Sequence, residues 1–111
     1  MQLFEKQLGQ LRPANTTAAS IYSPGTNVTA VRLSLVICNT TATTAKFRVF
    51  HDDDGTTYDE STALLFDADI LGNHTVEVDG FKAMDNPSGN IAVRTDTADA
   101  LTFSLYGAEV V

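Results

Sequence analysis

Apolar and polar side chains alternate along short stretches of this chain. In the clearest stretch, residues 28–38, one side holds Val31, Leu33, Leu35 and Ile37, and the other side holds Ala30, Arg32 and Ser34. Successive side chains of a β-strand point to opposite faces of the sheet, so a period of two indicates a strand with one buried face. The pattern therefore predicts a half-buried strand with Val31 on its apolar face and Ala30 on its polar face.

The same alternation recurs four times later in the chain. The repeats are centred on Phe47 and Val49, on Val76 and Val78, on Ile91 and Val93, and on Leu101, Phe103 and Leu105. Weaker strands are predicted for residues 18–23 and 80–84. Turn-forming sequences rich in Gly, Pro, Asn and Asp separate the strands, which recur at intervals of roughly 10–15 residues. This spacing is typical of an antiparallel sandwich or small barrel, not of strand–helix–strand units.

We therefore expect an all-β fold, an antiparallel, jelly-roll-like β-sandwich of about seven or eight short strands. The single sandwich domain is predicted for residues 13–111, after an N-terminal arm in residues 1–12. The arm fits either one or two helical turns or an extended segment, which would close a sheet or bind a partner. Residues 60–71 fit either a short helix or an edge strand.

Composition narrows the class of protein. The chain has 111 residues, a net charge of −7, 43% apolar residues and 19% charged residues, which fits one globular domain. The acidic balance argues against nucleic acid, because phosphate binding rests on Lys and Arg. No apolar run approaches the roughly 20 residues that span a bilayer, and the start lacks the features of a signal peptide. We expect no nucleic-acid partner and no membrane partner.

An acidic loop is the first candidate for chemistry. Asp52, Asp53 and Asp54 precede Gly55, and calcium prefers carboxylate and carbonyl oxygens. An EF-hand with Gly55 at its sixth position would need acidic residues where Phe50 and Ser61 stand, so the EF-hand pattern is not met. The loop is either an irregular calcium site or a solvated hairpin tip. We expect the hairpin tip, with no metal bound.

Catalytic patterns give little support for an enzyme. Nucleophilic catalysis needs Ser or Cys beside a base and an orienting group, and the only histidines are His51 and His74. The sequence has neither a Gly-x-Ser-x-Gly elbow nor a phosphate-binding loop. We expect a protein that is not an enzyme and has no cofactor. Three arginines sit on the polar sides of predicted strands and form either a basic stripe or, as we expect, ion pairs with the Asp-rich loops: Arg32, Arg48 and Arg94.

Several longer motifs carry a resemblance to a known group of proteins. They are Gln7-Leu8-Gly9-Gln10-Leu11-Arg12-Pro13, Ile21-Tyr22-Ser23-Pro24, Ile37-Cys38-Asn39-Thr40-Thr41, Phe47-Arg48-Val49-Phe50, Ala63-Leu64-Leu65-Phe66-Asp67 and Leu101-Thr102-Phe103-Ser104-Leu105-Tyr106-Gly107-Ala108-Glu109. Through these motifs, residues 7–109 resemble small β-sandwich virion proteins of tailed bacteriophages. The group includes capsid decoration (cement) proteins and tail- or neck-associated proteins.

The resemblance implies a non-enzymatic structural protein, often a trimer, that is made in the bacterial host cytoplasm and resides in the virion. We expect a decoration protein that binds the major capsid protein or another virion protein and stabilises the shell. The alternatives are a tail-associated or receptor-binding component, or a carbohydrate-binding module with a calcium at the acidic loop. The apolar arm is predicted to bind the partner by adding a strand to an exposed sheet edge, through Leu3, Phe4, Leu8 and Leu11.

Overall fold

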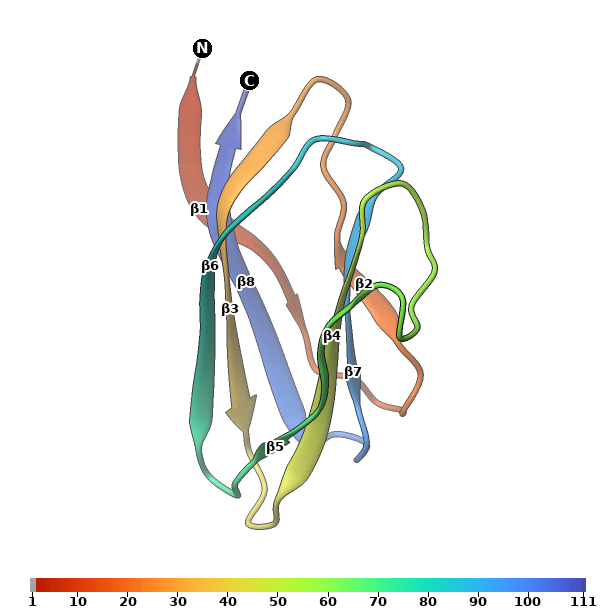
Figure 1. Cartoon of the computed structure of the whole chain (residues 1–111). Coiled ribbons are helices and arrows are strands. Elements are labelled where there is room, and N and C mark those ends of the chain that lie inside the picture. Colours follow the sequence, from red (N-terminus) through yellow and green to blue (C-terminus); the bar gives the residue numbers. More distant parts are fainter. Residues whose placement is uncertain (1) are drawn as a thin grey trace.

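The computed structural model describes residues 2–111, except for the side chains of Gly80 and Phe81. Met1, the first residue of the predicted arm, lies outside the described residues. Two four-stranded antiparallel sheets pack face to face, and no helix long and apolar enough to cross a bilayer occurs in the described part (Figure 1). The strands are β1 (Leu3–Leu11), β2 (Ala19–Tyr22), β3 (Thr29–Asn39), β4 (Ala45–Asp52), β5 (Ala63–Ile70), β6 (Thr75–Met84), β7 (Asn90–Thr95) and β8 (Leu101–Val110).

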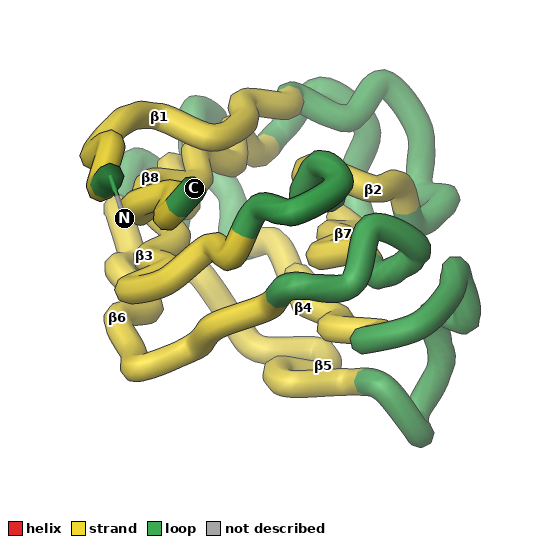
Figure 2. The backbone as a smooth tube through the Cα atoms, turned by 90° about the horizontal axis from the view of Figure 1, so that it is seen from above, coloured by secondary structure: helices red, strands yellow, loops and turns green. Residues whose placement is uncertain are grey.

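The strand order identifies the sandwich as a jelly roll. The first sheet has the order β1-β8-β3-β6, and the second has the order β2-β7-β4-β5. Strands from opposite ends of the chain pair in a nested series: β1 with β8, β2 with β7, β3 with β6 and β4 with β5. A long hairpin rolled into two sheets has this arrangement, which defines the jelly roll. Viewed from above, the two layers lie side by side with loops around their rim (Figure 2). The predicted fold class is confirmed.

The core fills the space between the two sheets. Alternate residues of the four central strands supply most of it, as the period of two predicted. These residues include Leu33, Leu35, Ile37, Phe47, Val49, Ile91, Val93, Leu101, Phe103 and Leu105. Phe47 of one sheet meets Phe103 of the other edge to face, with ring centroids 6.4 Å apart. Such aromatic pairs contribute about 0.5–1.5 kcal/mol beyond the area they bury.

One predicted face of β3 is wrong at its start. Ala30 is fully buried in the core, whereas Val31 is only half-buried. The cause is a bulge at Arg32, which has a positive φ of 55° and shares the place opposite Gly107 with Leu33. An extra residue in one strand inverts the faces of all residues before it. Leu33, Leu35 and Ile37 follow the bulge and point inward as predicted.

The two segments for which the sequence allowed either a helix or an extended conformation are both extended. Residues 63–70 form the edge strand β5 instead of a short helix, and residues 3–11 form β1. The segment predicted as an arm therefore lies along β8, from Leu3 opposite Val110 to Leu11 opposite Phe103. Residues 80–84 do not form a separate strand, because they continue β6.

A buried asparagine fastens the end of the sandwich opposite the chain termini. Asn39, only 1% exposed, donates through Nδ2 to the carbonyl oxygens of Thr43 at 2.8 Å and Ile70 at 3.1 Å. Its Oδ1 accepts from the backbone N–H of Thr41 at 3.0 Å. One amide group thereby joins the β3–β4 turn to the end of β5. Because a buried polar group must be satisfied, all these bonds contribute to the stability of the turn.

Candidate assembly surface

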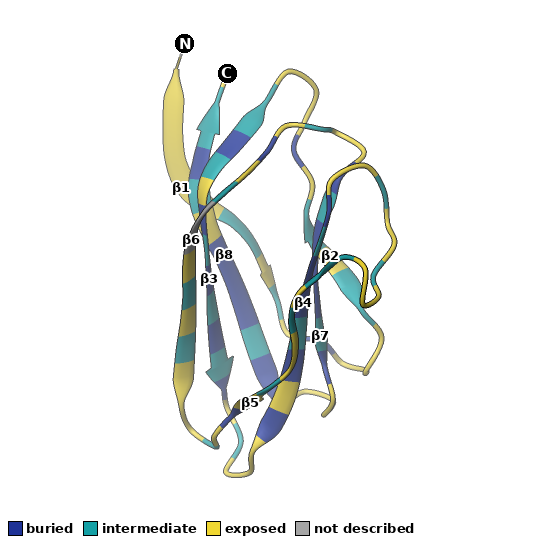
Figure 3. Ribbon diagram, viewed as in Figure 1, coloured by how far each residue is buried: buried dark blue, intermediate teal, exposed yellow. Residues whose placement is uncertain are grey.

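The edge strand β1 offers the clearest surface for a partner. It pairs only with β8, so one side of its backbone faces away from the sheet. Figure 3 shows the first half of β1 exposed, beside the C-terminal end of β8. The pairing continues past both strands, because Gln2 and Val111 exchange backbone hydrogen bonds of 3.1 and 3.0 Å. From Gln2 and Val111 onward, β1 and β8 therefore form one end of the sheet, and unpaired edges of this kind accept strands from other chains.

The structure divides the four apolar residues predicted to bind a partner. Leu8 and Leu11 are partly buried and pack against the core, whereas Leu3 and Phe4 are 47% and 48% exposed. The C-terminal residue Val111 is 61% exposed at the same end. We call Leu3, Phe4 and Val111 the terminal apolar patch. The pairing of the chain ends places these three residues at one end of the β1–β8 edge, with Leu3 and Phe4 on opposite faces of the strand. The sequence pattern alone gave no sign of Val111.

A three-residue link anchors the patch to the opposite sheet. The Tyr22 hydroxyl donates to Oε2 of Glu109 at 2.6 Å, and Lys6 Nζ lies 2.7 Å from Oε1 of the same carboxylate. The hydrogen bonds from Lys6 and Tyr22 lower the pKa of Glu109. Burial and the Glu109 carboxylate raise the pKa of Tyr22. The sequence did not predict this link, because Tyr22 and Glu109 lie at opposite ends of the chain and pair only in the fold.

The other apolar edge is β5, but its charges are already paired. Phe66 is 40% exposed, and the Arg48 guanidinium lies 3.8 Å from its ring centroid. Arg48 also donates to both oxygens of Asp67, at 2.6 and 3.1 Å, and these bonds lower the pKa of that carboxyl. Asp67 has a positive φ of 55° in an irregular part of the strand. Bulges and paired charges protect an edge from further strands.

Arg32 and Arg48 form ion pairs, but not with the Asp-rich loops, and Arg94 bonds to a backbone carbonyl oxygen. Arg48 pairs with Asp67 in β5, and Arg32 pairs with Glu5 in β1 at 3.2 Å. Arg94 lies opposite Arg48 in the sheet and donates through Nε to the carbonyl oxygen of Thr16 at 2.8 Å. Arg32 belongs to the other sheet, so the three do not line up as one stripe. Their partners lie on the adjacent strand β5, on β1 across the intervening β8, and in the β1–β2 connection.

The acidic loop uses its first carboxylate to hold its own backbone. Asp52 is 8% exposed and accepts from the backbone N–H groups of Thr57 at 2.8 Å and Asp54 at 3.2 Å. These bonds, the one from Thr57 first, lower the pKa of Asp52. The Asp53 side chain is 72% exposed. Among residues 2–111, no three His, Cys, Asp or Glu side chains are grouped closely enough to hold a metal ion.

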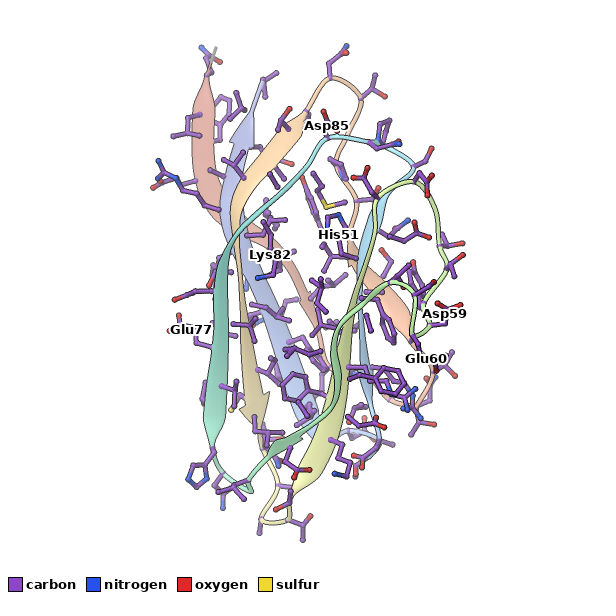
Figure 4. The ribbon with its side chains drawn as sticks, in the orientation of Figure 1. His51, Asp59, Glu60, Glu77, Lys82 and Asp85 are labelled. Atoms are coloured by element: carbon purple, nitrogen blue, oxygen red, sulfur yellow. The ribbon has the colours of Figure 1, made fainter. Side chains whose placement is uncertain are left out.

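His51 is a polar residue for which the sequence patterns predicted no specific role. Figure 4 places it beside the space between the sheets, whereas Asp59 and Glu60 lie on the β4–β5 loop. Its Nε2 is buried without a hydrogen-bond partner, and the nearest carboxylate oxygen, Oδ1 of Asp53, is 3.9 Å away. That distance is too long for a hydrogen bond.

Comparisons with known proteins add little to this picture. No known protein family matches the sequence, and no curated protein matches it. The structure of infectious bursal disease virus, Gx strain, matches 96% of this chain and 29% of that chain, with a TM-score of 0.45 and 10% identity. The Gt strain matches 97% of this chain and 29% of that chain, with a TM-score of 0.38 and 10% identity. This chain thus spans less than a third of the chains it matches, and similarity at these TM-scores supports no conclusion about function.

Proposed function

We propose that this protein is a non-enzymatic structural component of a virion that joins its neighbour through the terminal apolar patch. The observation that carries the proposal is the position of Leu3 and Phe4. Both are nearly half exposed, and both lie on an edge strand whose outer backbone groups are unpaired. Exposed apolar side chains on an open edge strand are typical of an interaction site.

The more specific proposal is a capsid decoration protein of a tailed bacteriophage that binds the major capsid protein as a trimer. The resemblance of residues 7–109 to such proteins supports it. The jelly-roll topology is compatible, since viral capsid domains use this fold. A fold hosts many functions, however, so the proposal depends on the surface and not on the topology.

Binding to capsid shells tests the patch directly. We would mix the full chain with shells that lack it and measure co-sedimentation. The double variant Leu3→Ser/Phe4→Ser should lose most of its binding, because it removes the apolar contacts. The matched control Leu71→Ser changes a 57% exposed leucine in the β5–β6 turn and should bind like the unchanged chain. Equal binding of the double variant and the control would contradict the proposal.

Point substitutions are preferable to a deletion of the predicted arm. Removing residues 1–11 would also remove Leu8 and Leu11 from their packing against the core and leave β8 without one of its two neighbours. Loss of binding would then report unfolding as well as a lost contact. Light scattering of the free protein tests the trimer separately, because a trimer has three times the 11.9 kDa mass of the chain.

A further inference from the structure

A hollow of about 350 Å³ opens on the outer face of the first sheet. It is lined by residues of β1, β3 and β8, and five of them bring polar or charged side chains: Glu5, Lys6, Gln7, Arg32 and Tyr106. Its volume falls at the lower end of the roughly 300–1,000 Å³ found for small-ligand sites. None of the three residues of the terminal apolar patch lines the hollow, so the proposed assembly surface does not account for it.

The bulge in β3 places Arg32 at this hollow. Arg32 has a backbone φ of 55°, a conformation that residues other than glycine rarely adopt. From there its Nη1 reaches Oε1 of Glu5 at 3.2 Å, although β8 lies between β3 and β1. Bulges often re-aim a side chain next to a binding site, and strained backbone persists where the surroundings hold it in place.

An exposed aromatic ring stands beside these groups. Tyr106 is 42% exposed, and its hydroxyl accepts a hydrogen bond from Nε2 of Gln7 at 3.4 Å. The next residue of β8 is Gly107, and Ala108 follows, so small residues adjoin the ring along its own strand. The hollow therefore combines an apolar ring face with three planar polar groups: an amide, a carboxylate and a guanidinium.

The charges around the hollow cancel in pairs. Arg32 is paired with Glu5, and Lys6 is paired with Glu109 at 2.7 Å. Both cations of these two ion pairs, Arg32 and Lys6, already have a carboxylate partner, so neither is free to bind an anionic ligand such as phosphate. The available donors and acceptors suit a neutral ligand that carries several hydroxyl groups, while the ring suits an apolar face of the same ligand.

We propose that this hollow binds a neutral saccharide, whose ring stacks on Tyr106 and whose hydroxyls bond to Glu5, Gln7 and Arg32. The sugar's C–H face covers the exposed aromatic ring, and adjacent hydroxyls match the paired oxygens and nitrogens of the planar groups. This inference is independent of the virion role, because it concerns a different set of side chains.

Nuclear magnetic resonance titration of the full chain tests the proposal. The probes are glucose, galactose, mannose and maltose, with glucuronate and inorganic phosphate as charged comparisons. We expect a neutral sugar to shift the backbone amides of Gln7, Arg32 and Tyr106 in a saturable way. Tyr106→Ala should weaken binding at least about tenfold, which corresponds to one missing good contact. Gln7→Ala, an exposed change, should weaken it less.

The matched control is Phe66→Ala, since Phe66 is 40% exposed on the other sheet. This variant should bind the sugar as the unchanged chain does. The proposal is overturned if no neutral sugar gives saturable shifts up to about 50 mM, a range that covers even weak millimolar binding. It is also overturned if shifts cluster away from the hollow, if only phosphate or glucuronate binds there, or if Tyr106→Ala binds unchanged.

Discussion

The Tyr22 hydroxyl and the Glu109 carboxylate meet at 2.6 Å across the two sheets, although 87 positions separate them in the chain. Lys6 completes the link from β1 at 2.7 Å. The link joins the first strand, the last strand and the opposite sheet at the end that carries the terminal apolar patch. The link therefore holds the strand that carries the exposed Leu3 and Phe4 in place. This lowers the entropic cost of ordering the strand when a partner binds.

Tyr22→Phe should lower the free energy of unfolding by about 1 kcal/mol, because it removes one hydrogen bond to a charged group and leaves the ring in place. Urea denaturation measures the change. Tyr106→Phe is the control: its hydroxyl takes part only in an exposed bond of 3.4 Å, so its effect should stay within about 0.5 kcal/mol. Equal effects of the two variants would show that the inter-sheet bond does not stabilise the fold.

The link also predicts a dependence of stability on pH. The folded pKa of Glu109 is lowered, so the stability that it contributes is complete above its unfolded pKa of about 4.3. That contribution is lost as the pH falls through the lower folded pKa. The melting temperatures of the unchanged chain and of Glu109→Gln should therefore differ at pH 6 and converge as the pH falls below the unfolded pKa and through the lowered folded pKa. A difference that stays constant or widens in acid would contradict this assignment. The lowered pKa values of Asp52 and Asp67 affect both proteins alike, so the comparison isolates Glu109.

Asn39→Ala should destabilise the fold by about 2–3 kcal/mol, since it leaves buried backbone groups of the β3–β4 turn and of β5 without partners. The control Asn15→Ala removes an exposed bond to the backbone N–H of Thr17 and should cost at most about 1 kcal/mol. Chemical denaturation of both variants decides the matter. Similar costs at the two positions would mean that the Asn39 amide has no special role in closing the sandwich.

Gly72→Ala tests the packing of the β5–β6 turn against the β3–β4 turn. A Cβ at Gly72 would lie 2.3 Å from the backbone carbonyl of Ala42, so one turn must move. Forced overpacking of this kind costs about 1–3 kcal/mol. At Gly25 the nearest atom would be 3.6 Å away, so Gly25→Ala should leave the melting temperature nearly unchanged. If both variants melt alike, the two turns are not packed as closely as described.

The sequence predicted the jelly-roll-like sandwich because apolar residues recur at every second position along much of its core strands. Phe47 and Val49 alternate with Lys46 and Arg48, Phe103 and Leu105 alternate with Thr102 and Ser104, and all four apolar residues are buried. The prediction was wrong at Ala30 and Val31, where one extra residue at Arg32 inverts the faces. A bulge leaves no mark on local periodicity, since it depends on how two distant strands pair.

The candidate surface was predictable only in part, for a related reason. The apolar character of Leu3, Phe4, Leu8 and Leu11 is evident in the sequence, but their division into exposed and core-packed residues follows from the register of β1 on β8. The contribution of Val111 and the hollow around Tyr106 depend on the same pairing. Contacts between chain ends arise from topology, which a local pattern does not encode.

The most direct test of the virion role is quantitative mass spectrometry of purified virions. The account predicts that this chain is present in a fixed ratio to the major capsid protein and stays with the shell when tails are removed. Its presence with the tails alone would replace the decoration role with a tail role. Its absence from purified virions would contradict the account.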